Sequence, residues 1–168
     1  MRTRFLGLFL ASLAGACLAP PQALAYEDAF TLELEAGYAL AVGDIPTNGM
    51  AASVLGTYGI NDAFTLRAGL TDSFHPRDAN LVHGSVDLIY MIDVLTVVPY
   101  VGAGIDAGWI RSDGAAAATL GGHLALGVDY LWTRTFFMGL EIRPTFFLRE
   151  ASLVDTPMML KFGFVFPN

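Results

Sequence analysis

The sequence predicts an all-β fold, an eight-stranded antiparallel up-and-down transmembrane β-barrel in residues 26–168. Three observations predict it. The N-terminus has the features of an export signal, apolar and polar residues alternate along most of the chain, and a composition that is 54 % hydrophobic offers no apolar run after the signal that is long enough for a membrane-spanning helix. With 18 glycines and 12 phenylalanines, the composition is also rich for a water-soluble domain.

Residues 1–25 have the organisation of a secretory signal peptide. Two arginines precede an apolar run over 5–19, prolines close this run, and the small residues Ala23 and Ala25 form a cleavage site. An uncleaved membrane anchor is the alternative, but the run is shorter than the ~20 apolar residues that span a bilayer. We therefore expect export, cleavage near Ala25 and a mature barrel domain over 26–168.

Cys17 is the only cysteine, and it lies in the segment that we expect to be removed. A lipid-modified N-terminus at Cys17 is an alternative; otherwise the mature chain has no disulfide and no thiolate metal site. Removal also takes away two arginines and no acid, which leaves 7 basic and 16 acidic side chains and a formal charge of −9. This balance argues against a nucleic-acid partner, because phosphate binding needs clustered Lys and Arg.

Stretches of period-2 alternation follow one another along the mature chain. In the first, every second residue from Phe30 to Leu40 is large or apolar and the residues between are polar or small, as in a strand whose two faces meet different surroundings. Six stretches are clean, and 50–60 and 95–110 are less regular. The eight predicted strands are 30–40, 50–60, 64–71, 85–92, 95–110, 123–132, 136–143 and 160–166.

The predicted connections alternate in length. Short links fall at 61–62, around Asp93 and at 133–135, and longer links fall at 43–49, 74–82, 111–118 and 149–156. Outer-membrane barrels have short periplasmic turns and longer external loops. An even number of strands also places both chain ends on the periplasmic side.

Aromatic residues on the apolar face lie mostly near the ends of the predicted strands. Such placement matches the aromatic girdles at the two interfaces of a membrane barrel. A soluble sandwich, or a soluble periplasmic barrel that binds an apolar ligand, is the alternative, but such a protein would carry more charge on its outer face. The aromatic residues are Phe30, Tyr38, Tyr58, Phe64, Tyr90, Trp109, Tyr130, Trp132, Phe136, Phe146 and Phe166.

Charged residues fall on the opposite face, which would line the lumen. Since unpaired buried charges are costly, we expect an ion network, with Lys161 close to Glu33 or Glu35 across the closing seam and close to Glu141. An eight-stranded interior is just wide enough for side chains to fill, so a general diffusion pore is not expected. The predicted lumen charges are Glu33, Glu35, Arg67, Asp87, Asp106, Asp129, Glu141, Arg143 and Lys161.

Two motifs resemble a known family. The segment 99–104 reads PYVGAG, and the last strand carries KFGFVF over 161–166. With the signal peptide, they are similar to the small outer-membrane β-barrel proteins of the OmpA, OmpX and OmpW kind. The resemblance implies that the barrel-assembly machinery reads Lys161, Gly163, Phe164 and Phe166, although this chain ends on Pro-Asn and not on an aromatic residue.

One group of residues has the composition of a catalytic or metal site. His83, Ser85, Asp106 and His123 fall on neighbouring predicted strands and could converge at the external mouth of the lumen. There they could form a Ser-His-Asp hydrolase or acyltransferase, or a His-carboxylate metal site. The alternative is a set of polar lumen residues without chemistry.

The leading hypothesis is therefore a non-enzymatic, porin-like envelope protein with a structural or surface role. We expect outer-membrane lipid and the barrel-assembly machinery as partners, a monomer, no cofactor and no metal. A lipid-modifying outer-membrane enzyme is the second hypothesis. His75 and Ser73 are expected to be exposed in a long loop.

Overall fold

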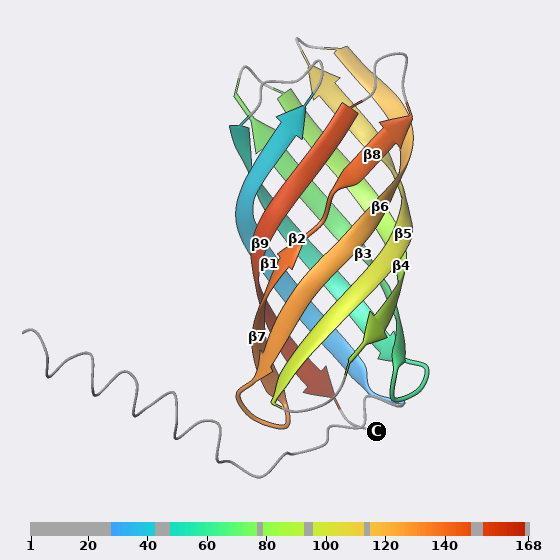
Figure 1. Cartoon of the computed structure of the whole chain (residues 1–168). Coiled ribbons are helices and arrows are strands. Elements are labelled where there is room, and N and C mark those ends of the chain that lie inside the picture. Colours follow the sequence, from blue (N-terminus) through green and yellow to red (C-terminus); the bar gives the residue numbers. More distant parts are fainter. Residues whose placement is uncertain are drawn as a thin grey trace, which may run out of the picture.

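The computed structural model describes residues 28–42, 48–76, 79–92, 96–112, 115–148 and 153–166. They form a closed antiparallel sheet, with both ends of the described chain at the same end of the barrel (Figure 1). That end is called the turn end here, and the opposite end the loop end. The predicted signal peptide, its cleavage site and Cys17 lie outside the described residues. Within those residues there is no helix with the length and apolarity needed to cross a membrane.

Nine strand segments build the eight strands of the barrel, as predicted. The less regular runs at 50–60 and 95–110 are confirmed as β2 and β5. β7 and β8 lie end to end as one barrel strand, because both pair with β6 and with β9. The segments are β1 Phe30–Val42, β2 Asn48–Gly59, β3 Phe64–His75, β4 Ala79–Met91, β5 Val97–Ser112, β6 Ala115–Leu131, β7 Phe136–Ile142, β8 Thr145–Leu148 and β9 Leu153–Phe166.

Two prolines explain the break between β7 and β8. The Leu124 amide donates to the Pro144 carbonyl at 3.2 Å, and the Arg143 amide donates to the Pro157 carbonyl at 3.0 Å. Neither proline has an N–H to return to the facing residue. Two ladder hydrogen bonds are therefore missing, while the register of β6 and β9 continues unchanged past the break.

The barrel closes between its first and last strands, β1 and β9. Following Cα partners once around the sheet from Leu32 leads back to β1 at Val42, a stagger of 42 − 32 = 10 residues. Such a stagger requires strands tilted against the barrel axis, typically by about 35–45°. The partners on this path are Leu32, Gly56, Ala68, Val86, Ile105, Gly122, Phe146, Val154 and Val42.

All four connections at the loop end are shorter than the sequence predicts: 43–47 and 149–152 replace 43–49 and 149–156, and the other two differ more. Most of 74–82 and 111–118 belongs to strands, and only 76–78 and 113–114 separate β3 from β4 and β5 from β6. The loop prediction was wrong because residues such as 115–118, all alanine, lack the large apolar side chains that mark alternation. β6 begins in this alanine run although its outward side chains there are small.

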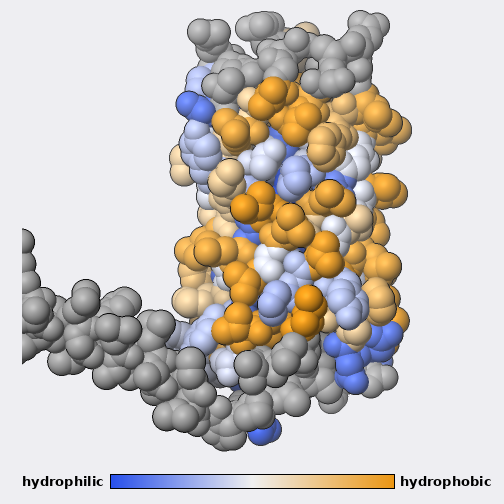
Figure 2. Space-filling view, viewed as in Figure 1, coloured by the Kyte–Doolittle hydropathy of each residue, from blue (hydrophilic) through white to orange (hydrophobic). Residues whose placement is uncertain are grey.

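Strict alternation of burial separates two faces along the strands. Side chains such as Leu66 and Leu70 on β3 face outward and are exposed, whereas Arg67 and Thr71 face the lumen and are buried. Apolar side chains cover much of the outer wall between the two ends (Figure 2). The chain therefore places its large apolar residues outside and its charges inside, the reverse of a water-soluble fold.

Candidate functional site

The lumen is divided into three layers. Apolar residues fill the turn end and the loop end, and charged residues fill the middle. The turn-end plug consists of Ala29, Ile89, Met91, Val98, Tyr100, Ala125, Leu131, Phe137 and Val165. The loop-end plug consists of Ala41, Ala79, Leu81, Ile110, Phe147 and Leu153.

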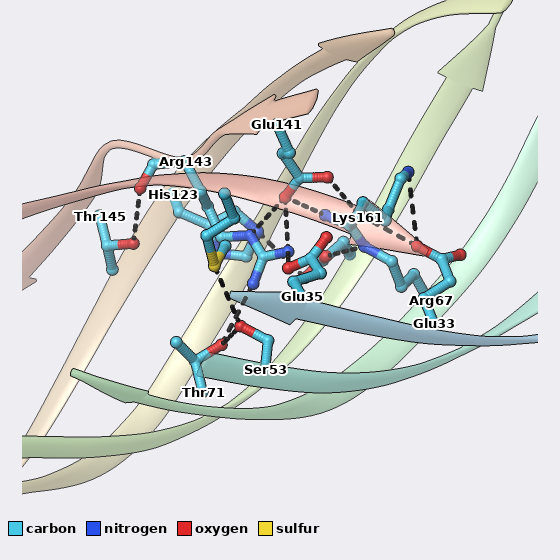
Figure 3. Close-up of polar contacts among 12 residues, drawn as sticks. Glu33, Glu35, Ser53, Arg67, Thr71, His123, Glu141, Arg143, Thr145 and Lys161 are labelled. Atoms are coloured by element: carbon cyan, nitrogen blue, oxygen red, sulfur yellow. Dashed lines mark hydrogen bonds and ion pairs between the residues drawn. The ribbon is translucent and has the colours of Figure 1, made fainter. Parts of the chain in front are cut away.

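Glu141 on β7 is the centre of the charged layer (Figure 3). Arg67 on β3 reaches across the lumen and donates from Nη1 to Glu141 Oε2 at 2.5 Å and from Nη2 to Oε1 at 3.1 Å. The Nε of Arg67 donates to Asp87 Oδ2 at 2.7 Å. The Tyr100 hydroxyl donates a further hydrogen bond of 2.6 Å to Glu141. Fixed donors thus surround this carboxylate, as a buried charge requires.

Arg143 lies two residues from Glu141 on the same barrel strand and faces the same lumen. Its Nε donates to Glu141 Oε1 at 2.7 Å, and its Nη2 donates to Glu35 Oε2 at 3.1 Å (Figure 3). Its Nη1 donates to the Thr71 hydroxyl at 3.2 Å. Arg143 therefore connects the seventh barrel strand with β1 and β3.

Lys161 on β9 is fully surrounded near the turn end. Its Nζ lies 2.9 Å from Asp129, 2.8 Å from the Tyr100 hydroxyl and 3.4 Å from Glu33 Oε2. The sequence predicts Lys161 beside Glu33 or Glu35 and beside Glu141. The structure places its Nζ beside Glu33 but puts Tyr100 between Lys161 and Glu141. Tyr100 could have been predicted to face the lumen, because on β5 it is an even number of residues from Asp106 and therefore lies on the same face.

The four candidate catalytic residues lie within the barrel and not at its mouth. His83, Ser85, Asp106 and His123 are all buried. The loop-end plug includes Phe147, whose ring meets His83 edge-on at 5.4 Å between centroids. The four residues come together as expected. Their expected position at the external mouth is wrong, because the strands and this plug extend further than the sequence indicates.

Their mutual geometry does not form a triad. His123 is held between two acids, with Nδ1 2.7 Å from Asp106 and Nε2 3.0 Å from Asp87. His83 Nε2 lies 3.5 Å from Asp106, and the buried Ser85 Oγ has no hydrogen-bond partner within the described chain. A triad needs a serine bonded to the base, and here both nitrogens of His123 face carboxylates.

His75 and Ser73 lie on β3 and not in a loop. Both are buried, so their expected exposure is wrong. Ser73 donates to Asp155 Oδ2 at 2.8 Å, and His75 Nε2 lies 3.6 Å from Asp155 Oδ1. Asp155 was missed as a lumen residue, although its odd number places it in line with Lys161 on β9.

A small cavity lies in the lumen near the turn end. The cavity beside Arg67, Tyr100 and Lys161 has a volume of about 20 Å³, enough for about one water molecule. Across the described ranges, there is no group of three or more His, Cys, Asp or Glu residues arranged to hold a metal ion. The middle of the lumen is a packed ion network and not an open channel.

The outer wall carries an apolar belt between two sets of aromatic residues. Four ring pairs lie at the turn end: Phe30–Phe166, Phe64–Tyr90, Tyr130–Trp132 and Phe136–Phe164. Tyr38, Phe74, Trp109 and Phe146 lie toward the loop end. Phe64 and Phe74 are ten residues apart on β3, which is ~33 Å along the strand. For a strand tilted by about 40° against the barrel axis, this length corresponds to ~25 Å along the axis. That height matches the apolar band of an outer-membrane barrel.

Comparison with known proteins gives the same result for the fold. Neisserial surface protein A is similar over 82 % of this chain and 99 % of its own, with a TM-score of 0.67 and 18 % identity. The N-terminal β-barrel domain of Pseudomonas aeruginosa OprF covers 83 % and 98 % with a TM-score of 0.63 and 19 % identity. The chain has the fold of the small outer-membrane β-barrels.

A third solved outer-membrane protein has a similar fold. OprG from Pseudomonas aeruginosa is similar over 84 % of this chain and 98 % of its own, with a TM-score of 0.55 and 14 % identity. No protein-family model and no curated protein matches the sequence.

The residues of the expected assembly signal lie on both faces of β9. Lys161 and Gly163 face the lumen, and Phe164 and Phe166 face outward among the turn-end aromatics. A Cβ on Gly163 would collide with the Phe137 ring. Packing alone thus explains Gly163, and Pro167-Asn168 lies outside the described residues.

Proposed function

We propose that this chain is a non-enzymatic integral protein of the bacterial outer membrane with a structural or surface role. The observation that carries the proposal is the apolar belt, which is exposed on all barrel strands and encloses a lumen of paired charges. In water this belt would be an aggregation surface. In a bilayer the belt contacts lipid chains that are equally apolar. Because the barrel is closed, no sheet edge has unpaired backbone groups in the lipid.

The packed lumen supports a closed barrel and not a solute channel. An ion crossing it would have to pass both apolar plugs and displace Arg67 or Arg143 from their carboxylates. Each such step breaks a buried ion pair, at a cost of about 3–5 kcal/mol. A structural or surface role is therefore better supported than transport through the lumen.

The buried constellation supports a protein without hydrolase activity. Ser85 has no base in hydrogen-bond contact, and the loop-end plug separates it from lipid headgroups. Substrate would have to enter through packed residues. The burial of Ser85 and its lack of a base favour the non-enzymatic role over a lipid-modifying enzyme.

Export by the secretory signal peptide and assembly by the barrel-assembly machinery are part of the proposal. The expected partners are outer-membrane lipid and that machinery, and the expected state is a monomer. The closed sheet supports a monomer, since β1 and β9 pair with each other and leave no edge for a second chain.

Cell fractionation combined with gel mobility tests the proposal. The protein is expected in the outer-membrane fraction, with a mobility in detergent gels that changes on boiling, and without stepwise conductance in planar bilayers. Recovery in the soluble periplasm without a heat shift would overturn membrane insertion. Recovery in the outer membrane with stepwise conductance would overturn only the closed lumen.

A further inference from the structure

A hollow of about 550 Å³ interrupts the apolar belt on the outer face of β3 to β6. This volume is in the range of small-ligand sites. Gly84, Ala107 and Leu120 lie nearer to the loop end than to the turn end of their strands. The outward side chains that line the hollow are Ala68, Gly84, Val86, Ile105, Ala107 and Leu120.

Gly84 leaves its part of the hollow open although packing does not require a glycine there. A Cβ on Gly84 would meet Leu70 Cδ2 at 3.5 Å, an ordinary contact. On the next strand, a Cβ on Gly108 would collide with the Val82 carbonyl oxygen, so that glycine is required. Since a glycine weakens a strand, the space at Gly84 is a feature that the fold itself does not explain.

Tall apolar side chains form the rim of the hollow. Ile105 is 71 % exposed and Leu120 is 63 % exposed, and both line the hollow beside Gly84 and Ala107. Trp109, which is 64 % exposed, is the next outward residue after Ala107 on β5. The shape is an apolar trough that opens toward the surroundings of the belt.

A positive charge lies directly beyond the trough. Ala107, Trp109 and Arg111 alternate on the outer face of β5, so Arg111 is the next outward residue toward the loop end. In the strands that the structure describes, Arg111 is the outward cation at this end, and its Cα partner on β4 is the neutral Asn80. The outward acid Asp72 lies two strands away on β3.

A second hollow provides an internal comparison. It has about 600 Å³ and lies on β1 to β3, with Ala36, Ala52 and Phe74 among its lining residues. Among the described residues, its lining contains no basic side chain. The two hollows share their size and apolar lining; Arg111 lines neither of them, but it lies two outward positions beyond Ala107, which lines the first.

We propose that the trough on β3 to β6 binds one acyl chain of an anionic, phosphate-bearing lipid of the outer leaflet, with Arg111 paired to the phosphate. The inference rests on the proposed membrane insertion. Arginine suits this role because its planar fork binds phosphate oxygens in pairs. Trp109 lies between the charge and the trough, at the level where indole rings favour the headgroup boundary.

Trp109 can report the bound lipid directly. The chain has two tryptophans, so Trp132→Phe leaves Trp109 as the single tryptophan, which can be excited selectively over tyrosine. The full-length protein with this change is reconstituted in phosphatidylcholine vesicles that contain a small fraction of either brominated phosphatidylglycerol or brominated phosphatidylcholine. We expect phosphatidylglycerol to be enriched about fivefold at Trp109, as one surface arginine attracts an anionic lipid.

Two pairs of variants test the two halves of the site. Arg111→Gln should abolish the preference for phosphatidylglycerol, whereas Arg134→Gln, in the turn at the other end, should leave it unchanged. Gly84→Leu should fill the trough and reduce quenching by both brominated lipids. Ala52→Leu fills the second hollow and should leave quenching of Trp109 unchanged.

Gel mobility of the same samples separates the two proposals. A heat-modifiable protein that is quenched equally by both lipids, or whose preference survives Arg111→Gln, would overturn the lipid site and leave membrane insertion standing. A protein without a heat shift would contradict insertion itself. Cross-linking of two copies through cysteines placed at Ala107 would overturn the lipid site by showing a second copy in the trough.

Discussion

Arg67 and Glu141 join opposite walls of the barrel by two parallel hydrogen bonds, of 2.5 and 3.1 Å, although 74 residues separate them in sequence. The pair is completely buried, and each member has further partners in Asp87, Tyr100 and Arg143. A buried pair of this kind contributes little when compared with an apolar replacement, but losing one partner is costly. The barrel therefore depends on the pair remaining complete.

The two single replacements of this pair should together destabilise the barrel more than the double replacement does. Arg67→Met and Glu141→Gln should each lower the free energy of unfolding by about 3–5 kcal/mol, because each leaves a charge unpaired in the lumen. The double variant should recover part of this loss. Urea unfolding in detergent, followed by the heat-modifiable gel shift, measures all three; additive losses would contradict direct coupling.

Lys161→Met should lower the unfolding midpoint in the same assay. The change leaves Asp129 and Glu33 without their common cation, at a cost of about 3–5 kcal/mol. Arg134→Gln removes an exposed positive charge from the turn before β7 and serves as the control. Equal midpoints for the two variants would show that Lys161 is not needed for pairing.

Pro144→Val should stabilise the barrel. Valine adds the N–H that Pro144 lacks opposite the Leu124 carbonyl, and one backbone hydrogen bond contributes about 1 kcal/mol. Leu140→Val alters the same outward face without adding a donor and controls for the side chain. A lower midpoint for Pro144→Val would mean that the interruption between β7 and β8 is itself required.

Gly163→Val should destabilise the folded barrel independently of cellular assembly. Its side chain would collide with the Phe137 ring, and overpacking of this kind costs about 1–3 kcal/mol. Gly84→Ala, whose Cβ would have ordinary contacts, should change the midpoint little. If purified Gly163→Val unfolds like the unmodified protein but fails to assemble in cells, Gly163 acts through the assembly machinery and not through packing.

Ser85 should not react with a fluorophosphonate probe. It lacks a base and lies beneath the loop-end plug, at 6 % exposure. A serine hydrolase mixed into the same sample checks the probe. Labelling of the folded protein that disappears in Ser85→Ala would contradict the non-enzymatic proposal and restore the lipid-modifying hypothesis.

Alternation in the sequence was enough to predict which face each strand residue occupies. Glu33, Arg67 and Lys161 all lie in the lumen, as their parity indicates. Parity does not specify partners across a barrel, because these depend on the stagger of ten residues around the sheet. The contact of Arg67 with Glu141 could therefore not be read from either strand alone.

The depth of a residue in the barrel was harder to predict than its face. His83 and His123 were expected at the mouth because the strands beyond them contain alanine, glycine and polar residues. These strands continue, and Phe147 and Leu81 cover the histidines from the loop end. Strand length is set by hydrogen bonding to neighbours, which a single segment does not reveal.

Because β1 pairs with β9, the acids of the first strand meet their nearest cations only when the last strands have been made. Glu33 and Glu35 are synthesised with the first strand, whereas Lys161, the cation next to Glu33, arrives with the last, and Arg143, which binds Glu35, arrives only with the strand before it. A polypeptide cut short before these strands would carry Glu35 into the lipid without Arg143 and Glu33 without its nearer cation, and it would expose an open sheet edge. The molecule thus contains its own check against truncation: an unfinished copy is the form least able to enter the membrane.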